Sequence, residues 1–294
     1  AGLKRLGVVK GDRIVAYMPN IPETIVAFLA TASIGAIWSV CSPEFGTSNV
    51  VDRFKQIAPK VLLTVDGYRY GGRAFSRLGT VAEIEAALPS LEKTVVLPYL
   101  VSDPVLAGLK SATLWENLET EGNYTIEFER VPFDHPLWVL YSSGTTGLPK
   151  PIVHGHGGIV LEHLKVLSLH LNLTPEDRFF WFTTTGWMMW NFNVGGLLLG
   201  TTIVIYDGSH GFPDMGALWR LAAETSLTYF GTSAPFIHAC MKAGMSPDRD
   251  TDLSHLRSVG STGTPLSPEG FQWVYENVGS DLLLASVSGG SDMC

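Results

Sequence analysis

The segment Leu137-Trp-Val-Leu-Tyr-Ser-Ser-Gly-Thr-Thr-Gly-Leu-Pro-Lys150 joins an apolar run to a polar loop that contains two glycines. The run Leu137–Tyr141 predicts a buried strand, and the residues after it predict a loop. Gly144 and Gly147 allow the backbone to turn sharply and to approach a ligand closely. Backbone N–H groups and hydroxyls could surround an anion there, and the ammonium group of Lys150 could neutralise it. The hydroxyls belong to Ser142, Ser143, Thr145 and Thr146.

This loop has two interpretations. A flexible surface loop rich in Ser and Gly would have the same composition. Phosphate binding is the better interpretation, because a buried strand leads into the loop and a lysine ends it. The spacing G-x-x-x-x-G-K-[ST] is absent, so the segment is not a Walker A loop.

Composition limits the class of protein. The chain has 294 residues, of which 46% are hydrophobic, and its formal net charge is −8. Such a chain can bury a large core, and its acidic balance excludes the basic footprint of a nucleic-acid-binding protein. Its three cysteines include no C-x-x-C pair, which indicates neither a disulfide framework nor a zinc site and favours a reducing, cytoplasmic compartment. The longest apolar stretches, 25–41 and 192–206, contain polar residues, so no membrane span is predicted.

Short apolar segments alternate with amphipathic ones along the chain, which predicts an α/β fold with a parallel sheet covered on both faces. We predict strands at 12–18, 36–40, 60–65, 94–97, 137–141, 178–182, 201–206, 227–230, 256–261 and 282–287. We predict helices at 23–33, from Thr47 or Ser48 to before Pro59, and at 77–88, 157–171, 187–199, 214–224, 234–243 and 268–277. The polar stretch 98–136 is expected to be a surface crossing with at most a short helix near 114–118.

Ligands in such sheets bind beyond the carboxyl ends of the strands, where three further segments of this chain carry suitable residues. In Thr183–Asn191, Gly186 turns the chain and Trp187, Met188 and Met189 could form adaptable walls of an apolar pocket. Ordinary core packing explains each of these three residues equally well. The segment Ser258–Pro265 could offer a flat edge to a purine, or it could be an ordinary turn from strand to helix.

The last segment, Ser286–Asp292, ends a predicted strand with two glycines and then presents a carboxylate. Beside a triphosphate, that carboxylate could bind Mg²⁺, whose other ligands would be phosphate oxygens and water. A helix N-cap is the alternative role for Asp292. The histidines at 154, 156 and 163 lack a third ligand at a suitable spacing, and we interpret them as loop or core residues. No G-x-S-x-G elbow is present, so acyl transfer through an enzyme serine is not supported.

Together, the four segments resemble the successive core motifs of the adenylate-forming superfamily, which includes acyl-CoA synthetases, peptide-synthetase adenylation domains and luciferases. Within it, the segments at 185–191, 206–209, 261–265 and 286–292 most resemble the acetoacetyl-CoA synthetase group, as do Ser42–Gly46 and Asp52–Ile57. The resemblance covers essentially the whole chain. It implies an α/β fold with parallel-rich sheets flanked by helices, in two pseudo-related halves at about 1–136 and 137–294.

The resemblance also implies roles for individual residues. Ser142 to Lys150 would hold the ATP phosphates, with Lys150, Thr145 and Thr146 acting on the reacting phosphates. The adenine pocket would be lined by Gly263, Thr264, Pro265, Ser288, Gly289 and Gly290. Ser291 and Asp292 stand where most relatives have Thr and Glu, and they would reach the α-phosphate and Mg²⁺. Trp187, Met188 and Met189 would face the acyl group. Arg69 and Arg73 resemble the basic contacts to the phosphates of coenzyme A.

One departure bears on the substrate. At the position of Gly289, the acetyl-CoA synthetases carry a Trp that closes the acyl pocket. A glycine there leaves room for a four-carbon acid such as acetoacetate. One methylene discriminates by only about 1–3 kcal/mol, so selection against butyrate requires polar contacts to the 3-oxo group.

The implied activity is that of an ATP-dependent acetoacetate–CoA ligase. The acid would attack the α-phosphorus of MgATP to give an acyl-AMP and pyrophosphate, and coenzyme A would then displace AMP. Alternatives are a ligase for acetate, propionate or butyrate, or a non-catalytic nucleotide-binding module. Relatives continue past Asp292 with a ribose-binding Asp, a hinge and a C-terminal domain that carries the adenylation lysine. We therefore expect this chain to be an internal part of the large N-terminal domain, with little activity alone.

Overall fold

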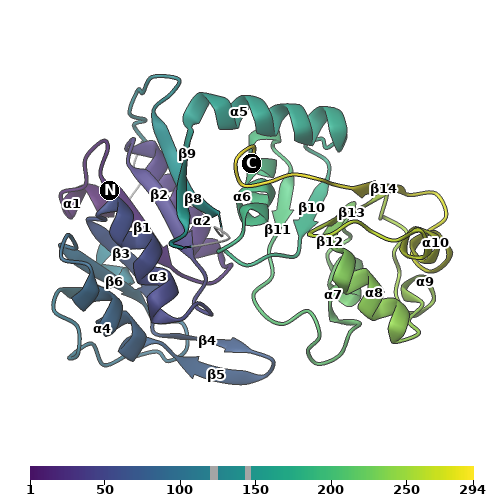
Figure 1. Cartoon of the computed structure of the whole chain (residues 1–294), viewed down its shortest axis with the longest axis horizontal. Coiled ribbons are helices and arrows are strands. Elements are labelled where there is room, and N and C mark those ends of the chain that lie inside the picture. Colours follow the sequence, from purple (N-terminus) through teal and green to yellow (C-terminus); the bar gives the residue numbers. More distant parts are fainter. Residues whose placement is uncertain (120–124, 143–146) are drawn as a thin grey trace. The chain divides into compact units, whose positions relative to one another are not determined.

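The computed structural model describes residues 1–119, 125–142 and 147–294, and the chain forms two compact units, Ala1–Ile159 and Val160–Cys294 (Figure 1). Each unit has a sheet of its own, and most pairings in both sheets are parallel. This confirms the predicted α/β class. None of the helices in the described residues is long and apolar enough to cross a bilayer.

The sheet of the first unit has, among the described residues, seven strands in the order β7-β6-β3-β1-β2-β8-β9. Their bounds are Arg13–Tyr17 (β1), Ile37–Cys41 (β2), Val61–Val65 (β3), Lys93–Leu97 (β6), Ala112–Leu114 (β7), Pro136–Ser142 (β8) and Lys150–Gly155 (β9). All neighbours pair in parallel except β8 and β9, which are antiparallel. Every residue of β3 is buried, as expected of a central parallel strand covered on both faces.

The helices of this unit are Gly2–Arg5 (α1), Pro22–Ser33 (α2), Thr47–Phe54 (α3) and Leu78–Ala87 (α4), with 3-10 turns at Lys55–Ile57 and Trp115–Leu118. Pro22 occupies the first turn of α2, and Gly35 follows its end with a φ of +71°, which glycine adopts without strain. Residues of α3 and α4, among them Val50, Phe54 and Ile84, pack with β1 and β3 in one core cluster.

Two parts of the first unit differ from the expectation. The stretch 98–136 contributes an edge strand, β7, which we did not expect, whereas its 3-10 turn at Trp115–Leu118 agrees with the short helix that we allowed there. After the polar loop, the chain returns as β9 before helix α5 begins at His156. In addition, Gly67–Tyr70 (β4) and Arg73–Ser76 (β5) form an antiparallel hairpin whose turn residues Gly71 and Gly72 both have positive φ.

The second unit contains, in the described residues, a five-stranded parallel sheet in the order β11-β10-β12-β13-β14. Its strands are Arg178–Trp181 (β10), Thr202–Val204 (β11), Tyr229–Ser233 (β12), Ser258–Thr262 (β13) and Leu283–Ser286 (β14). The helices, starting from α5 at the junction of the units, are His156–Leu164 (α5), Met188–Gly195 (α6), Ala217–Glu224 (α7), Ala234–Lys242 (α8), Pro247–Asp250 (α9) and Pro268–Asn277 (α10). A π-helical segment, Lys165–His170, continues α5, and a 3-10 turn, Gly196–Leu199, continues α6.

Side chains of this sheet alternate between two cores. Phe180 and Phe230 pack with residues of α7, α8 and α10 in one core cluster. Phe179, Trp181 and Tyr229 pack with Phe192 of α6 in another. Helices α8 and α10 begin with hydroxyl caps, because Ser233 and Ser267 accept hydrogen bonds from backbone N–H groups three residues later.

The indole of Trp181 lies across two glycines. Trp181 is the register partner of Gly231 in β12, and Gly231 is the partner of Gly260 in β13. A Cβ at Gly231 would overlap the Trp181 ring, and one at Gly260 would come within 2.7 Å of the same ring and of the Tyr229 hydroxyl. Glycine is therefore required at both positions as long as the indole stays in place.

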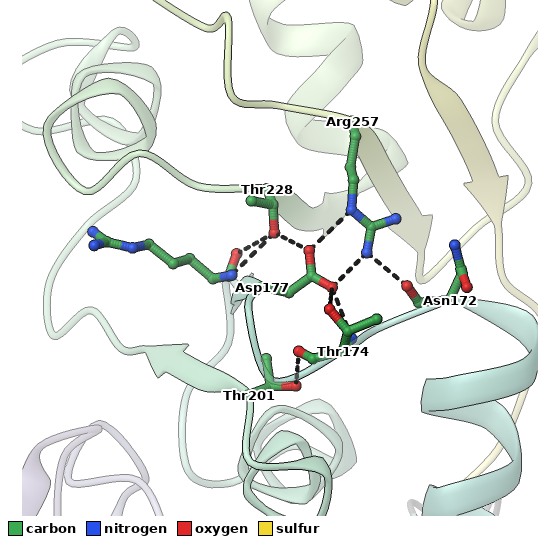
Figure 2. Close-up of polar contacts among 7 residues, drawn as sticks. Asn172, Thr174, Asp177, Thr201, Thr228 and Arg257 are labelled. Atoms are coloured by element: carbon green, nitrogen blue, oxygen red, sulfur yellow. Dashed lines mark hydrogen bonds and ion pairs between the residues drawn. The ribbon is translucent and has the colours of Figure 1, made fainter.

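An ion pair holds the amino-terminal ends of three strands together (Figure 2). Asp177, Thr228 and Arg257 each precede a strand, β10, β12 and β13 respectively. Arg257 donates from Nε and Nη2 to the two carboxylate oxygens of Asp177, at 2.9 and 2.6 Å. The Thr228 hydroxyl donates to the same carboxylate at 2.7 Å, and Thr174 donates its backbone N–H and its hydroxyl.

The carboxylate of Asp177 is almost fully buried, so its charge is stable only with these donors. Burial acts to raise the pKa of Asp177, but the hydrogen bonds from Arg257, Thr228 and Thr174 outweigh it and lower the pKa to about 2. The ionised form is therefore part of the folded structure across the physiological range.

Gly260→Ala tests the packing of Trp181. The added methyl group forces the indole and the Tyr229 ring to move, and we expect it to reduce the free energy of unfolding by about 1–3 kcal/mol. Urea unfolding of the full-length protein, followed by tryptophan fluorescence, measures this loss. Gly158→Ala is the control, because a Cβ there meets nothing within 4 Å. Equal stability of the two variants would contradict the packing argument.

Asp177→Asn tests the ion pair. The amide keeps the size of the side chain but leaves the Arg257 guanidinium without its counter-charge, and we expect a loss of about 2–3 kcal/mol in unfolding free energy. Glu162→Gln removes the exposed ion pair to Lys165 and should have a much smaller effect. Similar losses in both variants would show that the buried pair is no more important than an exposed one.

The contribution of Asp177 to the free energy of unfolding should decrease as the pH falls. Its pKa is lower in the folded chain than the ordinary value of 3.8, so its stabilisation is complete above about pH 4 and is lost as pH falls towards 2. The difference in unfolding free energy between the wild type and Asp177→Asn should therefore be constant from pH 5 to 7 and smaller at pH 3. A difference that does not change between pH 3 and 7 would contradict the lowered pKa.

Candidate functional site

A cavity of about 700 Å³ lies beyond the carboxyl ends of four parallel strands of the second unit. Its walls come from the segments that follow β10, β12, β13 and β14, the position at which parallel sheets bind ligands. The lining residues are Trp181 to Thr184, Trp187 to Met189, Thr232, Ser233, Thr262 to Pro265 and Ser286 to Ser291. Three of the four segments singled out in the sequence therefore meet here.

Backbone and hydroxyl contacts fix two of these segments to each other. The Val287 N–H donates to the Ser261 carbonyl at 2.7 Å, and the Thr262 hydroxyl donates to the Val287 carbonyl at 2.9 Å. The segments after β13 and β14 are thus held side by side. At the neighbouring strand, the Phe182 N–H donates to the Gly231 carbonyl at 2.8 Å, which extends the pairing of β10 with β12 to the edge of the cavity.

One wall of the cavity is apolar. Trp187 is the residue before helix α6, and its N–H donates to the Thr184 carbonyl at 3.2 Å. Its side chain is 65% exposed, a large value for an indole, whereas Met188 and Met189 are half-buried against the core cluster of Phe179 and Trp181. An exposed aromatic ring beside two adaptable thioethers can pack against an apolar ligand.

Another part of the lining carries little side-chain bulk. Gly263 has a φ of +90°, a conformation that favours glycine, and Thr264 and Pro265 are exposed beside it. A Cβ built at Gly289 or at Gly290 meets nothing within 4 Å. The cavity is therefore open at these positions, and a ligand can approach the backbone there.

The predicted adenine and acyl residues thus lie around one cavity: Trp187, Met188, Met189, Gly263, Thr264, Pro265, Ser288, Gly289, Gly290 and Ser291. Asp292 comes directly after this wall and is exposed, in a turn closed by the N–H groups of Met293 and Cys294 on the Gly290 carbonyl. No group of three or more residues able to ligate a metal occurs among the described residues. A cation at Asp292 would therefore depend on oxygens of a bound ligand.

The histidines of the sequence belong to the chain's packing. Trp138 Nε1 donates to His154 Nδ1 at 3.2 Å, and His163 is fully buried in α5. Burial, and then the neighbouring His135, lower the pKa of His156. His163 is thus a core residue, as interpreted, whereas His154 lies half-buried on β9 and His156 lies half-buried at the start of α5, so neither of these two is a loop or core residue.

The segment that opens with Ser142 lies in the first unit. Ser142 ends β8 and is the register partner of Lys150, the first residue of β9, whose side chain is exposed. Gly147 has a φ of +123° and open space around it. The predicted phosphate-loop residues Ser143, Gly144, Thr145 and Thr146 lie outside the described residues.

Strand β8 is anchored beside this segment. The Tyr141 hydroxyl donates to the Arg53 carbonyl at 2.8 Å, and the Arg53 guanidinium lies 5.9 Å from the centre of the Tyr141 ring. Burial is the main cause of a raised pKa of Tyr141, which keeps the phenol neutral. These contacts fix the end of β8, where the segment begins.

Arg69 and Arg73 lie on the β4–β5 hairpin, and both are exposed. The register pairs Arg69 with Ala74 and Tyr70 with Arg73. Because neighbouring residues of a strand point to opposite faces, the two arginines leave opposite faces of the hairpin. The hairpin does not place both guanidinium groups on one face.

The sequence did not indicate Trp181, Thr232 and Ser233 as part of a site, and it gave no role to Thr184 and Thr262 within the segments that it singled out. A signal was available, since hydroxyl-bearing residues end or follow the strands that surround the cavity. The same rule that selected Ser286–Asp292 would have selected Thr232 and Ser233, had the strand there been predicted to extend beyond Phe230.

Comparison with known proteins agrees with this geometry. The family model described as AMP-binding enzyme matches residues 1–288. The structure of acetoacetyl-CoA synthetase from Streptomyces lividans superposes with a TM-score of 0.93 and 55% identity, over 99% of this chain and 45% of that one.

Two curated relatives extend the comparison. Acetoacetyl-coenzyme A synthetase of Rhizobium meliloti (strain 1021) is 49% identical over 99% of this chain and 45% of its own length. Malonamoyl-CoA synthetase vrtB of Penicillium aethiopicum is 38% identical over 100% of this chain and 43% of its own length. The chain thus spans less than half the length of these relatives. Because the family model covers nearly all of the chain, it belongs to the family of AMP-binding enzymes.

Proposed function

We propose that the full-length protein is an ATP-dependent acetoacetate–CoA ligase. It would convert the acid and ATP to acetoacetyl-AMP and pyrophosphate, and then transfer the acyl group to coenzyme A with release of AMP. A relative from Rhizobium meliloti and a solved structure from Streptomyces lividans are both named acetoacetyl-CoA synthetase. They are 49% and 55% identical to this chain, which supports the reaction class. The observation that carries the choice of acid is the open space at Gly289, in a cavity that Trp187 also lines.

In the first step, the chain's contribution is to position the reactants. Gly263, Thr264 and Pro265, with Ser288, Gly289 and Gly290, would hold the adenine, since their backbone groups and small side chains line the cavity. Lys150, with the loop from Ser142 to Gly147, would bind the phosphates of ATP. An exposed ammonium group can stabilise the charge that develops on phosphate during the attack of the carboxylate.

Mg²⁺ fits the residues present to a limited degree. Asp292 offers one exposed carboxylate next to Ser291 of the cavity wall, and a single carboxylate plus phosphate oxygens and water is a usual Mg²⁺ environment. When bound, the ion would neutralise charge on the phosphates. The chain's own part is to hold this carboxylate at the end of the Gly290–Cys294 turn.

The acyl group would lie between the Trp187, Met188 and Met189 wall and Gly289. The space at Gly289 suits an acid longer than acetate, because a side chain at that position would occupy it. The names of the relatives refer to acetoacetyl and malonamoyl groups, and both groups carry a carbonyl oxygen on the third carbon. This supports a short acid with a 3-carbonyl as the substrate class.

Two further assignments complete the proposal. Arg69 and Arg73 would contact the phosphates of coenzyme A, with at most one of them on each face of the hairpin. A cytoplasmic location fits the three cysteines, all of which are free thiols and buried.

ATP–pyrophosphate exchange by the full-length protein tests the proposed function, because it reports the first step without coenzyme A. The panel consists of acetoacetate, malonamate, butyrate, propionate and acetate. We expect the highest kcat/KM with acetoacetate. Faster exchange with acetate than with acetoacetate would contradict the proposal, and so would the absence of exchange with every acid.

We predict that Gly289→Trp changes the preference of the enzyme between acetoacetate and acetate. The indole would fill the space at Gly289, so we expect the ratio of kcat/KM for acetoacetate to that for acetate to fall by about tenfold or more. Gly289→Ala adds only a methyl group and should keep the preference for acetoacetate. If the tryptophan variant retains the wild-type ratio, Gly289 does not border the acyl group.

A further inference from the structure

Lys150, which would bind the phosphates of ATP, stands at the start of an edge strand. It is the first residue of β9 and the register partner of Ser142, the last residue of β8. Among the described strands, β9 lies at the edge of the sheet and pairs with β8 alone. A ligand binds more tightly to a group that is already held in place, because less conformational freedom is lost on binding. Contacts that hold the chain next to Lys150 therefore bear on ATP binding.

Gln56 makes such a contact. Its Nε2 donates to the Pro149 carbonyl at 2.8 Å, although the two residues are 93 positions apart in the chain. The same nitrogen donates to the Asp52 carbonyl at 2.7 Å, one turn earlier in α3. An amide nitrogen carries two hydrogens, so both bonds can form together. The side chain thus joins the end of α3 to the residue before Lys150.

The helix that carries Gln56 is fixed in the core of the first unit. Val50 and Phe54 of α3 are fully buried and pack with residues of β1 and β3. Gln56 lies in the 3-10 turn Lys55–Ile57, which follows α3 directly, and Ile57 packs against the same core cluster. A hydrogen bond from this turn therefore ties Pro149 to a rigid part of the unit.

The same turn of helix also contacts the strand that leads into the segment. The Tyr141 hydroxyl donates to the Arg53 carbonyl at 2.8 Å, and Arg53 is three residues before Gln56. Ser142 follows Tyr141, and Lys150 follows Pro149. One turn of helix thus holds the residue before each member of the Ser142–Lys150 pair.

The bond from Gln56 contributes little to the stability of the fold. Its side chain is exposed, so water can replace either partner when the bond is lost. Its local effect is larger, because the peptide unit is planar and the ring of Pro149 fixes φ. A held Pro149 carbonyl therefore sets the direction in which the backbone enters Lys150.

We propose that Gln56 is a positioning residue for the phosphates of ATP: through the Pro149 carbonyl, it holds Lys150 in the place where the ammonium group meets them. The inference rests on the proposed function of Lys150. Gln56 itself need not touch ATP. Without its amide, Lys150 keeps its charge but the backbone before it moves more freely, so ATP binds more weakly while the acid site is unchanged.

Gln56→Met in the full-length protein tests the proposal. Methionine has a similar length and a similar helix propensity, and it removes the donor. In ATP–pyrophosphate exchange with acetoacetate, we expect KM for ATP to rise by about 3–10-fold, the effect of one neutral hydrogen bond. KM for acetoacetate should change by less than about twofold. The melting temperature without ligand should fall by no more than about 2 °C.

Calorimetry separates positioning from a general disturbance of the fold, and it needs no turnover. The Kd of MgATP should rise in Gln56→Met by the same factor as KM. AMP carries one phosphate instead of three, so its Kd should rise by less than about twofold. A disturbed fold would weaken the binding of both nucleotides.

Two further variants complete the test. Gln272 is also exposed on a helix, α10, and its Nε2 donates to Glu276 at 2.7 Å. Gln272→Met should therefore leave the Kd of MgATP unchanged. In a Lys150→Ala background, Gln56→Met should weaken ATP binding no further, because Gln56 acts through Lys150.

The outcomes distinguish this inference from the function on which it rests. If the wild type shows exchange with acetoacetate and Gln56→Met binds MgATP as tightly as the wild type, the role of Gln56 is wrong and the proposed function stands. Equal weakening of ATP and AMP, or full additivity with Lys150→Ala, would also overturn the role of Gln56. A wild type that binds MgATP but shows no exchange with any acid would overturn the proposed function, and calorimetry would still decide on Gln56.

Discussion

The parallel register of the five-stranded sheet is the constraint on which the cavity depends. Because β10, β12, β13 and β14 run in the same direction, the segments that leave them emerge at one edge. Residues more than a hundred positions apart in the chain, such as Met188 and Gly290, therefore border the same space. A single antiparallel strand among the four would carry its following segment to the other edge and remove one wall.

The two ends of these strands are stabilised in different ways. At the amino ends, the buried carboxylate of Asp177 joins three strands through Arg257 and Thr228, so the register is fixed by charge and hydrogen bonds (Figure 2). Near the carboxyl ends, the Trp181 indole covers Gly231 and forms part of the cavity wall. Packing around Trp181 and the Asp177 ion pair fixes the sheet itself. Small residues and hydroxyls at the carboxyl ends of its strands can then contact a ligand.

Local patterns predicted much of this fold. Apolar runs, Pro22 at a helix start and Gly35 after a helix end placed most helices and strands of the chain, because these signals act within a few residues. The antiparallel return of β9 and the pairing of Asp177 with Arg257, 80 residues later, depend on contacts distant in sequence. The hydrogen bond from Gln56 to Pro149 likewise joins residues 93 positions apart, so it could not be seen in the sequence.

The central claim is that this cavity holds the acyl end of an acyl-adenylate. A crystal structure of the full-length protein with a non-hydrolysable 3-oxobutyl ester of AMP tests it most directly. The account predicts that the acyl chain lies in this cavity, bordered by Trp187 and Gly289. An acyl chain bound outside this cavity would contradict it.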